Sequence, residues 1–426
     1  MTTTTPPTRP AADGEGDAGS SGFAARVSLG RVFAPVPSEF LLIASTALLL
    51  TGFGLMMVLS ATMASAMADG QSPFEVVMKQ AIFAVIGIPL MFVASRLPVG
   101  FWKKIAWPAL IAATCFQMLV FVPGLGVAND GNQNWIQIGG IQAQPSEFLK
   151  LALALWLGYV LFRKQTLLGS WTHVFIPVVP VGGLVIGLVA VGSEDLGTGM
   201  ILMAILLGCL FFSGVKLRIF ILPLLIVVFA AVFFAVTSPN RMARIMSSLV
   251  NFDSMDCYNA ASGDCYQAVH GIWALANGGI FGLGLGNSRE KYGWLPARSN
   301  DYIFAILGEE LGLVGCAVVL LLFTVFAIAT FQVIRKTRDP FVRIVSGGII
   351  VWIVGQALVN IGVVLRLFPV LGVPLPFMSQ GGTSLLSVLV ACGVLLSFAR
   401  TIPTGPAAAV AAAPRPSAAE RGRRAR

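Results

Sequence analysis

Long apolar runs recur along this chain, and they constrain its fold more than any other feature. Each run is close to the roughly 20 residues that a helix needs to cross the hydrocarbon core of a membrane. We place them at roughly 40–62, 76–95, 105–122, 147–162, 173–192, 199–214, 219–237, 303–333, 344–365 and 383–400. The sequence therefore predicts an all-α polytopic membrane protein with about ten transmembrane helices.

The composition excludes other broad classes of protein. Hydrophobic residues make up 56% of the 426 residues and charged residues only 11%, whereas soluble domains carry about 25% charged residues. A soluble enzyme, a disordered chain and a coiled coil are therefore excluded. The net charge of +9 fits either nucleic acid or a membrane surface as a partner.

The positions of the cations decide between these partners. Most of the 28 Lys and Arg residues fall in the tails and in alternate short connections between the runs. Cytoplasmic segments carry such an excess, so we expect no nucleic acid and place both termini in the cytoplasm. We expect a disordered tail over 1–38, a membrane domain over 39–400 and a disordered basic tail over 401–426. The first tail lacks the features of a cleavable signal peptide, so the first run is expected to act as an uncleaved anchor.

The longest connection, residues 238–302, is expected on the outer side of the membrane between spans seven and eight. Loops of this length in a compact protein are usually functional. Its amphipathic piece at 266–276 predicts a short helix on or in the outer leaflet. Cys257 and Cys265 flank a polar stretch and can form a disulfide outside the cell; two free thiols are the alternative.

Asp301 stands directly before the apolar run that starts at Ile303. Asn300 and Asp301 in this position are typical of a helix N-cap, and a capping carboxylate at a membrane surface can also act as a base. Glu309 and Glu310 follow in the same run, where acids are costly and usually face a cavity or a partner. At about 100° per residue, Glu309 is the better candidate for a cavity shared with Asp301. Helix–helix hydrogen bonding is the alternative for both glutamates.

Other charged residues gather near the expected outer ends of the runs. Glu147 and Lys150 have the i, i+3 spacing that allows pairing on one helix face, and Lys79 lies a short way into the second run. The outer loop also carries five cations, Arg241, Arg244, Arg289, Lys291 and Arg298. Arg and Lys bind phosphate groups, so a pyrophosphate-bearing lipid would suit them. Structural ion pairs, or contacts to a partner or to lipid, are the alternative.

The segment 277–288 is dense in glycine and includes Gly278, Gly279, Gly284 and Gly286. No strand or βαβ unit surrounds it, so we reject a dinucleotide-binding interpretation. Such glycines permit tight turns and a close approach of the backbone to a ligand.

Four segments together resemble the SEDS family, which includes FtsW and RodA. The main segment is NGGIFGLGLGNSREKYGWLPARSNDYIFAILGEELG at 277–312. The others are QPSE with Lys150 at 144–150, DLGTG at 195–199, and NIG at 360–362 followed by PLPFMSQGGTS at 374–384. The resemblance spans about residues 40–400. The wording GLGNS at 284–288 is more similar to the division member FtsW than to the elongation member RodA.

The resemblance implies a ten-helix glycosyltransferase that polymerises lipid II into glycan strands at the outer face of the cytoplasmic membrane during septal cell-wall synthesis. It implies that Asp301 is the essential carboxylate, which we expect to act as general base. Candidate substrate-binding residues are Lys79, Glu147, Lys150, Arg241, Arg244, Gln267, Lys291, Arg298 and Ser379, with Glu309 and Glu310 in support. A divalent cation, Mg²⁺ or Mn²⁺, at Asp301 is compatible with its oxygen ligands; no organic cofactor is expected.

The implied partners are a class B penicillin-binding protein, which would contact the late spans and the large outer loop, other division proteins and membrane lipids. Four places depart from the family pattern. Asn134 replaces an Arg, and Gln380 replaces a Tyr. The segment 297–300, which includes Arg298, replaces Glu-Ala-His-Thr, and Leu365-Arg366 lies where Thr-Gly is common. A lipid II flippase and a non-catalytic scaffold that activates the transpeptidase are rival functions. A flippase needs a polar path through the membrane, whereas the polar residues here concentrate outside it, which favours surface chemistry.

Overall fold

The computed structural model describes residues 37–402, except for 69, 71, 130–131, 140, 217, 226–228, 230–241 and 243–264. Both predicted tails fall almost entirely outside this part of the chain. So do most of the predicted seventh span at 219–237 and the first half of the large outer loop.

Within these ranges, nine helices are long and apolar enough to cross a membrane, and each coincides with a predicted run. Six are continuous in the chain: α1 (Ser38–Ala68), α2 (Pro73–Ala94), α3 (Val99–Met118), α4 (Pro145–Arg163), α7 (Leu196–Ser213) and α15 (Gly382–Ala399). Two spans contain π-helical turns. In one span such a turn joins α5 (Trp171–Pro177) to α6 (Gly183–Gly187), and in the other such a turn joins α13 (Pro340–Ile350) to α14 (Gln356–Val364). The remaining one is α12 (Ile303–Lys336). The chain is a multi-pass membrane protein.

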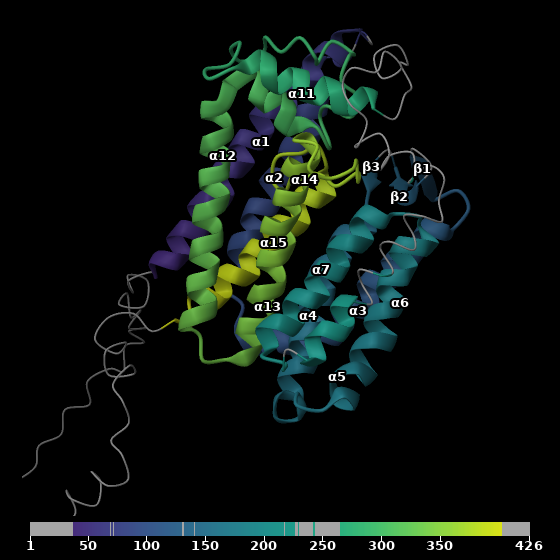
Figure 1. Cartoon of the computed structure of the whole chain (residues 1–426), viewed down its shortest axis with the longest axis vertical. Coiled ribbons are helices and arrows are strands. Elements are labelled where there is room, and N and C mark those ends of the chain that lie inside the picture. Colours follow the sequence, from purple (N-terminus) through teal and green to yellow (C-terminus); the bar gives the residue numbers. More distant parts are fainter. Residues whose placement is uncertain are drawn as a thin grey trace, which may run out of the picture. The chain divides into compact units, whose positions relative to one another are not determined.

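Helix α4 lies in the interior of the helix bundle, packed against α3, α7, α13 and α15 (Figure 1). Its sequence is apolar on all sides, which is typical of a helix that is buried all round. Trp156, Leu149 and Leu153 are fully buried. The first turn of α4 is buried as well, so Glu147 and Lys150 lie inside the protein and not on its surface.

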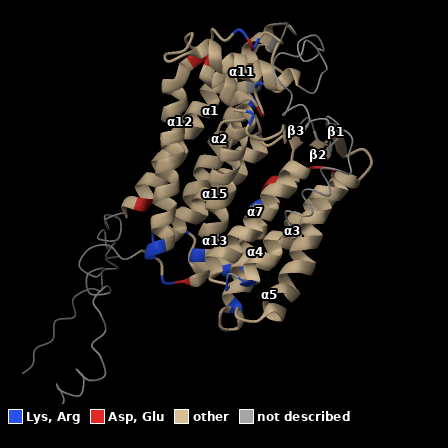
Figure 2. Ribbon diagram, viewed as in Figure 1, with Lys and Arg blue, Asp and Glu red and all other residues tan. Residues whose placement is uncertain are grey.

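Helix α11 (Tyr266–Gly278) confirms the predicted amphipathic helix of the large loop and packs on α12. Figure 1 shows it across one end of the bundle, beside α1 and α12. In Figure 2, Lys and Arg gather near the opposite end, where α4 leads into α5 and α12 into α13. We refer to these as the α11 end and the basic end.

A small antiparallel sheet, which the sequence analysis did not predict, lies between α3 and α4. It consists of β1 (Gly126–Asn129), β2 (Asn132–Ile138) and β3 (Ile141–Ala143), in that order. Ile136 pairs with both Gly126 and Ala143, and the register shifts in β1 after Val127. The sheet brings Asn134 to the start of α7.

Helix α12 is broken at Gly312, whose φ of 67° and ψ of −165° are not helical. This conformation belongs almost only to glycine. The break separates a half-helix, residues 303–311, from the long remainder, residues 313–336. The half-helix begins beside Asp301 and ends with Glu309 and Glu310.

Candidate active site

Asp301 is half-buried at the α11 end of α12, and a second segment of the chain holds its backbone. The Asn360 side-chain amide donates to the Asp301 carbonyl at 2.7 Å and to Val373 O at 2.8 Å. The Ser379 hydroxyl donates to Asn300 O at 2.6 Å, and the Gln380 N–H donates to Ser299 O at 2.8 Å. Three successive carbonyls are therefore bound by residues 360, 379 and 380, which fixes the position of Asp301.

The prediction that Asn300 and Asp301 cap the helix is wrong. Helix α12 begins at Ile303, and its N-cap residue is Tyr302, which makes no side-chain capping hydrogen bond. The three bound carbonyls account for the difference, because they tie residues 299–301 to α14 and to the loop after it. The Asp301 carboxylate lies near Gly372 of that loop: a Cβ atom at Gly372 would be 3.8 Å from Asp301 Oδ2.

The predicted pairing of Glu147 with Lys150 is confirmed. Lys150 Nζ lies 2.8 Å from Glu147 Oε1, and both side chains are 1% exposed. Lys150 also donates to Gln356 Oε1 at 3.1 Å, and Gln356 donates to Pro374 O at 2.8 Å. In this structure Glu147 neutralises the charge of the buried Lys150. Lys150 also links α4 to α14 through Gln356, which lies one turn before Asn360.

Glu309 and Glu310 both bind the segment that follows the glycine-rich turn. Glu309 accepts hydrogen bonds from the Ser288 hydroxyl at 2.5 Å and from the Arg289 N–H at 3.1 Å. Glu310 accepts from Ser60 of α1 at 2.6 Å and forms an ion pair with Lys291 at 3.1 Å. Both side chains are buried. The preference for Glu309 as the better candidate for a cavity shared with Asp301 stays a prediction, whereas the alternative, helix–helix hydrogen bonding, is confirmed for Glu310 through Ser60 of α1.

The glycine-rich segment approaches the backbone of α12 closely. Leu283 N–H donates to Glu309 O and Gly284 N–H to Glu310 O, each at 3.0 Å, and Leu313 N–H donates to Gly279 O at 2.9 Å. These bonds join the glycine-rich segment to backbone groups on both sides of the break at Gly312. A Cβ atom on Gly278 would lie 1.9 Å from Gly308 O. Gly279, Gly284 and Gly286 have positive φ.

The predicted substrate cations that the structure describes differ in burial and in their contacts. Lys291 is fully buried against Glu310, so its role here is to hold the loop. Arg298 is half-buried and its Nε donates to Ala61 O at 3.2 Å, while Lys79 is exposed on α2. Gln267 donates to Pro296 O at 3.2 Å. Arg241 and Arg244 lie outside the described residues.

Of the predicted disulfide, the structure describes one cysteine. Cys265 is disulfide-bonded, whereas Cys257, its predicted partner, lies outside the described residues. Cys115, Cys209, Cys316 and Cys392 are free.

Two groups near the site have shifted pKa values. Burial raises the pKa of the Glu290 carboxyl; the His270 hydrogen bond, 2.6 Å long, and the His270 charge oppose this shift, and Glu309 adds to it. Burial also raises the pKa of the Tyr302 hydroxyl, the Asp301 charge raises it further and the Arg366 charge lowers it. Tyr302 is therefore an un-ionised phenol at neutral pH.

Sequence reasoning missed Gln356 and Asn360 as site residues. The signal was present, because two amides at i, i+4 spacing inside an apolar run lie on one helix face and polar groups at that depth usually bind a partner.

One departure from the family pattern has a structural account: Asn134 donates to Asp195 Oδ2 at 2.8 Å. In the part of the chain that the structure describes, no three His, Cys, Asp or Glu side chains are placed to bind a metal ion.

Comparison with known proteins agrees with the fold and with these segments. A family model described as cell cycle protein, covering FtsW, RodA and SpoVE, matches residues 40–402. The chain is 36% identical over 371 residues to the probable peptidoglycan glycosyltransferase FtsW of Mycobacterium tuberculosis, covering 87% of this chain and 70% of that protein. It is 37% identical over 366 residues to the stage V sporulation protein E of Bacillus subtilis, covering 85% of this chain and 97% of the relative.

Two solved structures share the fold. A chain from a study of polymerisation and crosslinking by a peptidoglycan synthase complex has a TM-score of 0.65 at 23% identity, covering 85% of this chain and 96% of that chain. The rod shape determining protein RodA of Thermus thermophilus has a TM-score of 0.59 at 20% identity, covering 88% of this chain and 100% of RodA. From the family match and the two relatives, we conclude that this chain belongs to the FtsW/RodA/SpoVE family of cell cycle proteins.

Proposed function

We propose that this protein is a peptidoglycan glycosyltransferase that polymerises lipid II at the outer face of the cytoplasmic membrane, in septal cell-wall synthesis, with Asp301 as general base. The observation that carries the proposal is the half-exposed Asp301, whose backbone is bound at three successive carbonyls. A catalytic base must be held in a fixed position. The names of the FtsW relatives support the same reaction class.

In the proposed reaction, the 4-hydroxyl of one lipid-linked sugar attacks the anomeric carbon of another. Asp301 accepts the hydroxyl proton, the new glycosidic C–O bond forms, and the bond to the lipid diphosphate breaks, so the diphosphate leaves with the bonding electron pair. One displacement of this kind inverts the anomeric centre. If a divalent cation, Mg²⁺ or Mn²⁺, binds at this site, Asp301 would be its ligand from the protein, and the cation would supply charge neutralisation for the leaving group.

The proposed orientation places the α11 end outside the cell and the basic end in the cytoplasm. The cations at the basic end include Lys103, Arg163, Lys164, Arg335 and Lys336, and Figure 2 shows Lys and Arg gathered there. Cytoplasmic segments of membrane proteins carry such an excess. Both termini are then cytoplasmic, and Asp301 faces substrate on the outer side.

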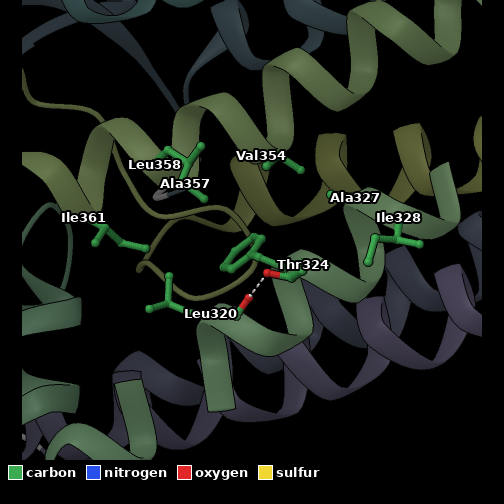
Figure 3. A pocket seen from close by; sticks show the side chains of 9 residues that line it. Leu320, Thr324, Ala327, Ile328, Val354, Ala357, Leu358 and Ile361 are labelled. Atoms are coloured by element: carbon green, nitrogen blue, oxygen red, sulfur yellow. Dashed lines mark hydrogen bonds between the residues drawn. The ribbon is translucent and has the colours of Figure 1, made fainter. Parts of the chain in front are cut away.

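The proposed protein partner is a class B penicillin-binding protein, bound through its single membrane span. Nine residues of α12, α14 and the π-helical turn before it line an apolar cavity of about 210 Å³ (Figure 3). The hydroxyl of its one polar lining residue, Thr324, already donates to Leu320 O at 2.8 Å. Such a lining suits an apolar helix and not a sugar diphosphate.

The test compares wild type with Asp301→Asn in polymerisation of purified lipid II, each with the cognate transpeptidase bound. We expect Asp301→Asn to lower the rate about 10²–10⁴-fold, the usual contribution of a general base. Glu75→Gln is the matched control, since Glu75 is an exposed carboxylate of α2; it should retain full activity.

The rival functions give different results in the same assay. Equal activity of Asp301→Asn and wild type would remove Asp301 from the chemistry. Absence of polymer from wild type with the partner bound would favour the scaffold. Movement of lipid II across vesicle membranes without polymer would favour the flippase.

A further inference from the structure

The glycine-rich segment after α11 exposes a cluster of large apolar side chains. Ile280, Phe281, Leu283 and Leu285 are all exposed, and in the described residues no large apolar side chain is more exposed than Phe281, at 83%. A single exposed leucine is ordinary, whereas a contiguous apolar patch marks a surface that a partner or a membrane covers. We call residues 280–285 the apolar turn.

The apolar turn is joined to the lipid-facing surface of α12. The Leu313 N–H donates to Gly279 O at 2.9 Å, and the Val314 N–H donates to Ile280 O at 3.1 Å. Leu313 and Val314 are themselves exposed, as is Leu321 further along the same helix. Exposed apolar side chains of a transmembrane helix pack against lipid tails, which are equally apolar. The apolar surface of α12 therefore continues onto the turn.

The backbone of the apolar turn makes hydrogen bonds inside the protein. The Gly282 N–H donates to Gly278 O at 2.7 Å, and α12 provides the acceptors for the N–H groups of Leu283 and Gly284. The two carbonyls that bind Leu313 and Val314 add to this bonding. Backbone groups without a partner are strongly disfavoured in lipid. A turn with these bonds can enter the boundary between head groups and acyl chains.

The charge pattern around the apolar turn is that of a segment that enters a membrane and returns to its surface. The chain has no Asp, Glu, Lys or Arg between His270 and Arg289. Shortly after Arg289, the side chains of Tyr292 and Trp294 are exposed. Tyr and Trp are enriched at the level of the lipid head groups, because each combines an apolar ring with a polar group.

We propose that the apolar turn anchors the large loop in the membrane leaflet at the α11 end. Ile280, Phe281 and Leu285 insert among the acyl chains, and Tyr292 and Trp294 lie among the head groups. The partner is bulk phospholipid, because the patch continues the lipid-facing surface of α12 and has no charged side chain to pair with a protein. Interfacial segments of this kind bury their apolar side chains at the head-group boundary.

The inference is independent of the proposed glycosyltransferase reaction. The proposed orientation determines only that the leaflet is the outer one. The anchor has a structural consequence, because Leu283 and Gly284 bind the carbonyls of Glu309 and Glu310. Lipid contact at the turn therefore sets the depth at which the half-helix 303–311 lies in the membrane.

The test places a fluorescent probe on the turn of the full chain in phospholipid vesicles. Phe281→Cys is made in a Cys115→Ser background, because Cys115 is exposed whereas the other free cysteines of the described residues are buried. We expect an emission shifted to the blue, quenching by nitroxide-labelled lipid and none by aqueous iodide. Leu321→Cys is the lipid-facing control. Lys104→Cys, at an exposed position of the basic end, is the water-facing control.

The depth of the nitroxide gives a second readout. Leu321 lies about 12 Å along α12 from Leu313, so it is deeper in the membrane than the turn. A nitroxide near the head groups should quench the probe at Phe281 more than the probe at Leu321, and a nitroxide near the chain ends should do the reverse. Leu285→Cys is a second position in the turn and should give the same result as Phe281→Cys.

Three results would overturn the inference, provided that the labelled variants unfold at the wild-type temperature. Iodide quenching at Phe281 equal to that at Lys104 shows that the turn lies in water. Protection from both quenchers in vesicles that hold this chain alone shows that protein, such as a second copy, covers the turn. Iodide quenching that disappears only when the transpeptidase is bound shows that the turn is a docking surface for that partner.

Discussion

At the scale of single residues, burial decides what an ion pair contributes more than its length does. The Lys291–Glu310 pair is 3.1 Å long and at most 1% exposed. The Lys103–Asp339 pair is shorter, at 2.6 Å, but its side chains are 22% and 32% exposed. Removing one partner of a buried pair leaves an uncompensated charge inside the protein, which typically costs about 3–5 kcal/mol. An exposed pair contributes about 0–1 kcal/mol.

We therefore expect Lys291→Met to destabilise the protein by roughly 3–5 kcal/mol and to lower its thermal unfolding midpoint. The double variant Lys291→Met with Glu310→Leu should recover much of that loss, because no charge is then left unpaired. Lys103→Met is the matched control and should change the midpoint little. Equal losses in Lys291→Met and Lys103→Met would contradict this account.

The same comparison shows what sequence could predict about residues. The Glu147–Lys150 pair was predictable because i, i+3 spacing within one helix fixes the geometry. The burial of Lys291 was not, since its partners Ser60 and Glu310 come from two distant helices. Arg366 has a φ of 59°, and this left-handed conformation also depends on the local fold and has no signal in the residue itself.

At the scale of elements, the break in α12 depends on one glycine. A Cβ atom on Gly312 would lie 2.4 Å from both Gly282 N and Ile280 O. Gly312→Ala must therefore displace the glycine-rich segment or straighten the helix. We expect a loss of roughly 2–4 kcal/mol from strain and overpacking, together with loss of polymerisation.

Limited trypsin digestion measures the displacement of the glycine-rich segment. Arg289 is exposed, and its backbone N–H donates to Glu309. Cleavage after Arg289 should be faster in Gly312→Ala than in wild type. Gly52→Ala of α1 is the control: no atom lies within 4 Å of its would-be Cβ, so cleavage should be unchanged. Wild-type cleavage and stability in Gly312→Ala would show that α12 tolerates closure of the break.

Elements were predictable to the extent that hydrophobicity alone determines them. Nine of the ten predicted runs coincide with spans in the described residues, because the membrane demands long apolar helices whatever their neighbours. The π-helical turns and the break at Gly312 were missed, since they depend on contacts with other segments. The sheet was missed because its strands are short and polar, and pairing with a neighbour stabilises each of them.

At the scale of the whole molecule, the apolar cavity that α12 and α14 line, called the groove below, predicts where the proposed partner binds. Ala327→Phe fills the groove, so we expect it to reduce co-purification of the transpeptidase about tenfold, which corresponds to roughly 1.4 kcal/mol. Leu321→Phe is the matched control, because Leu321 is 61% exposed on the same helix and does not line the groove. Equal recovery of the partner with both variants would place its span elsewhere.

The half-helix 303–311 has a mechanical consequence. One end is tied to α14 through Asp301 and to the loop after α14 through Asn300, and the other end is tied to the glycine-rich segment through Glu309 and Glu310. The break at Gly312 separates it from residues 313–336 of α12. A displacement of α11, which packs on α12, is therefore expected to reach Asp301 through this half-helix. The position of Asp301 is in this way linked to the large loop through the half-helix.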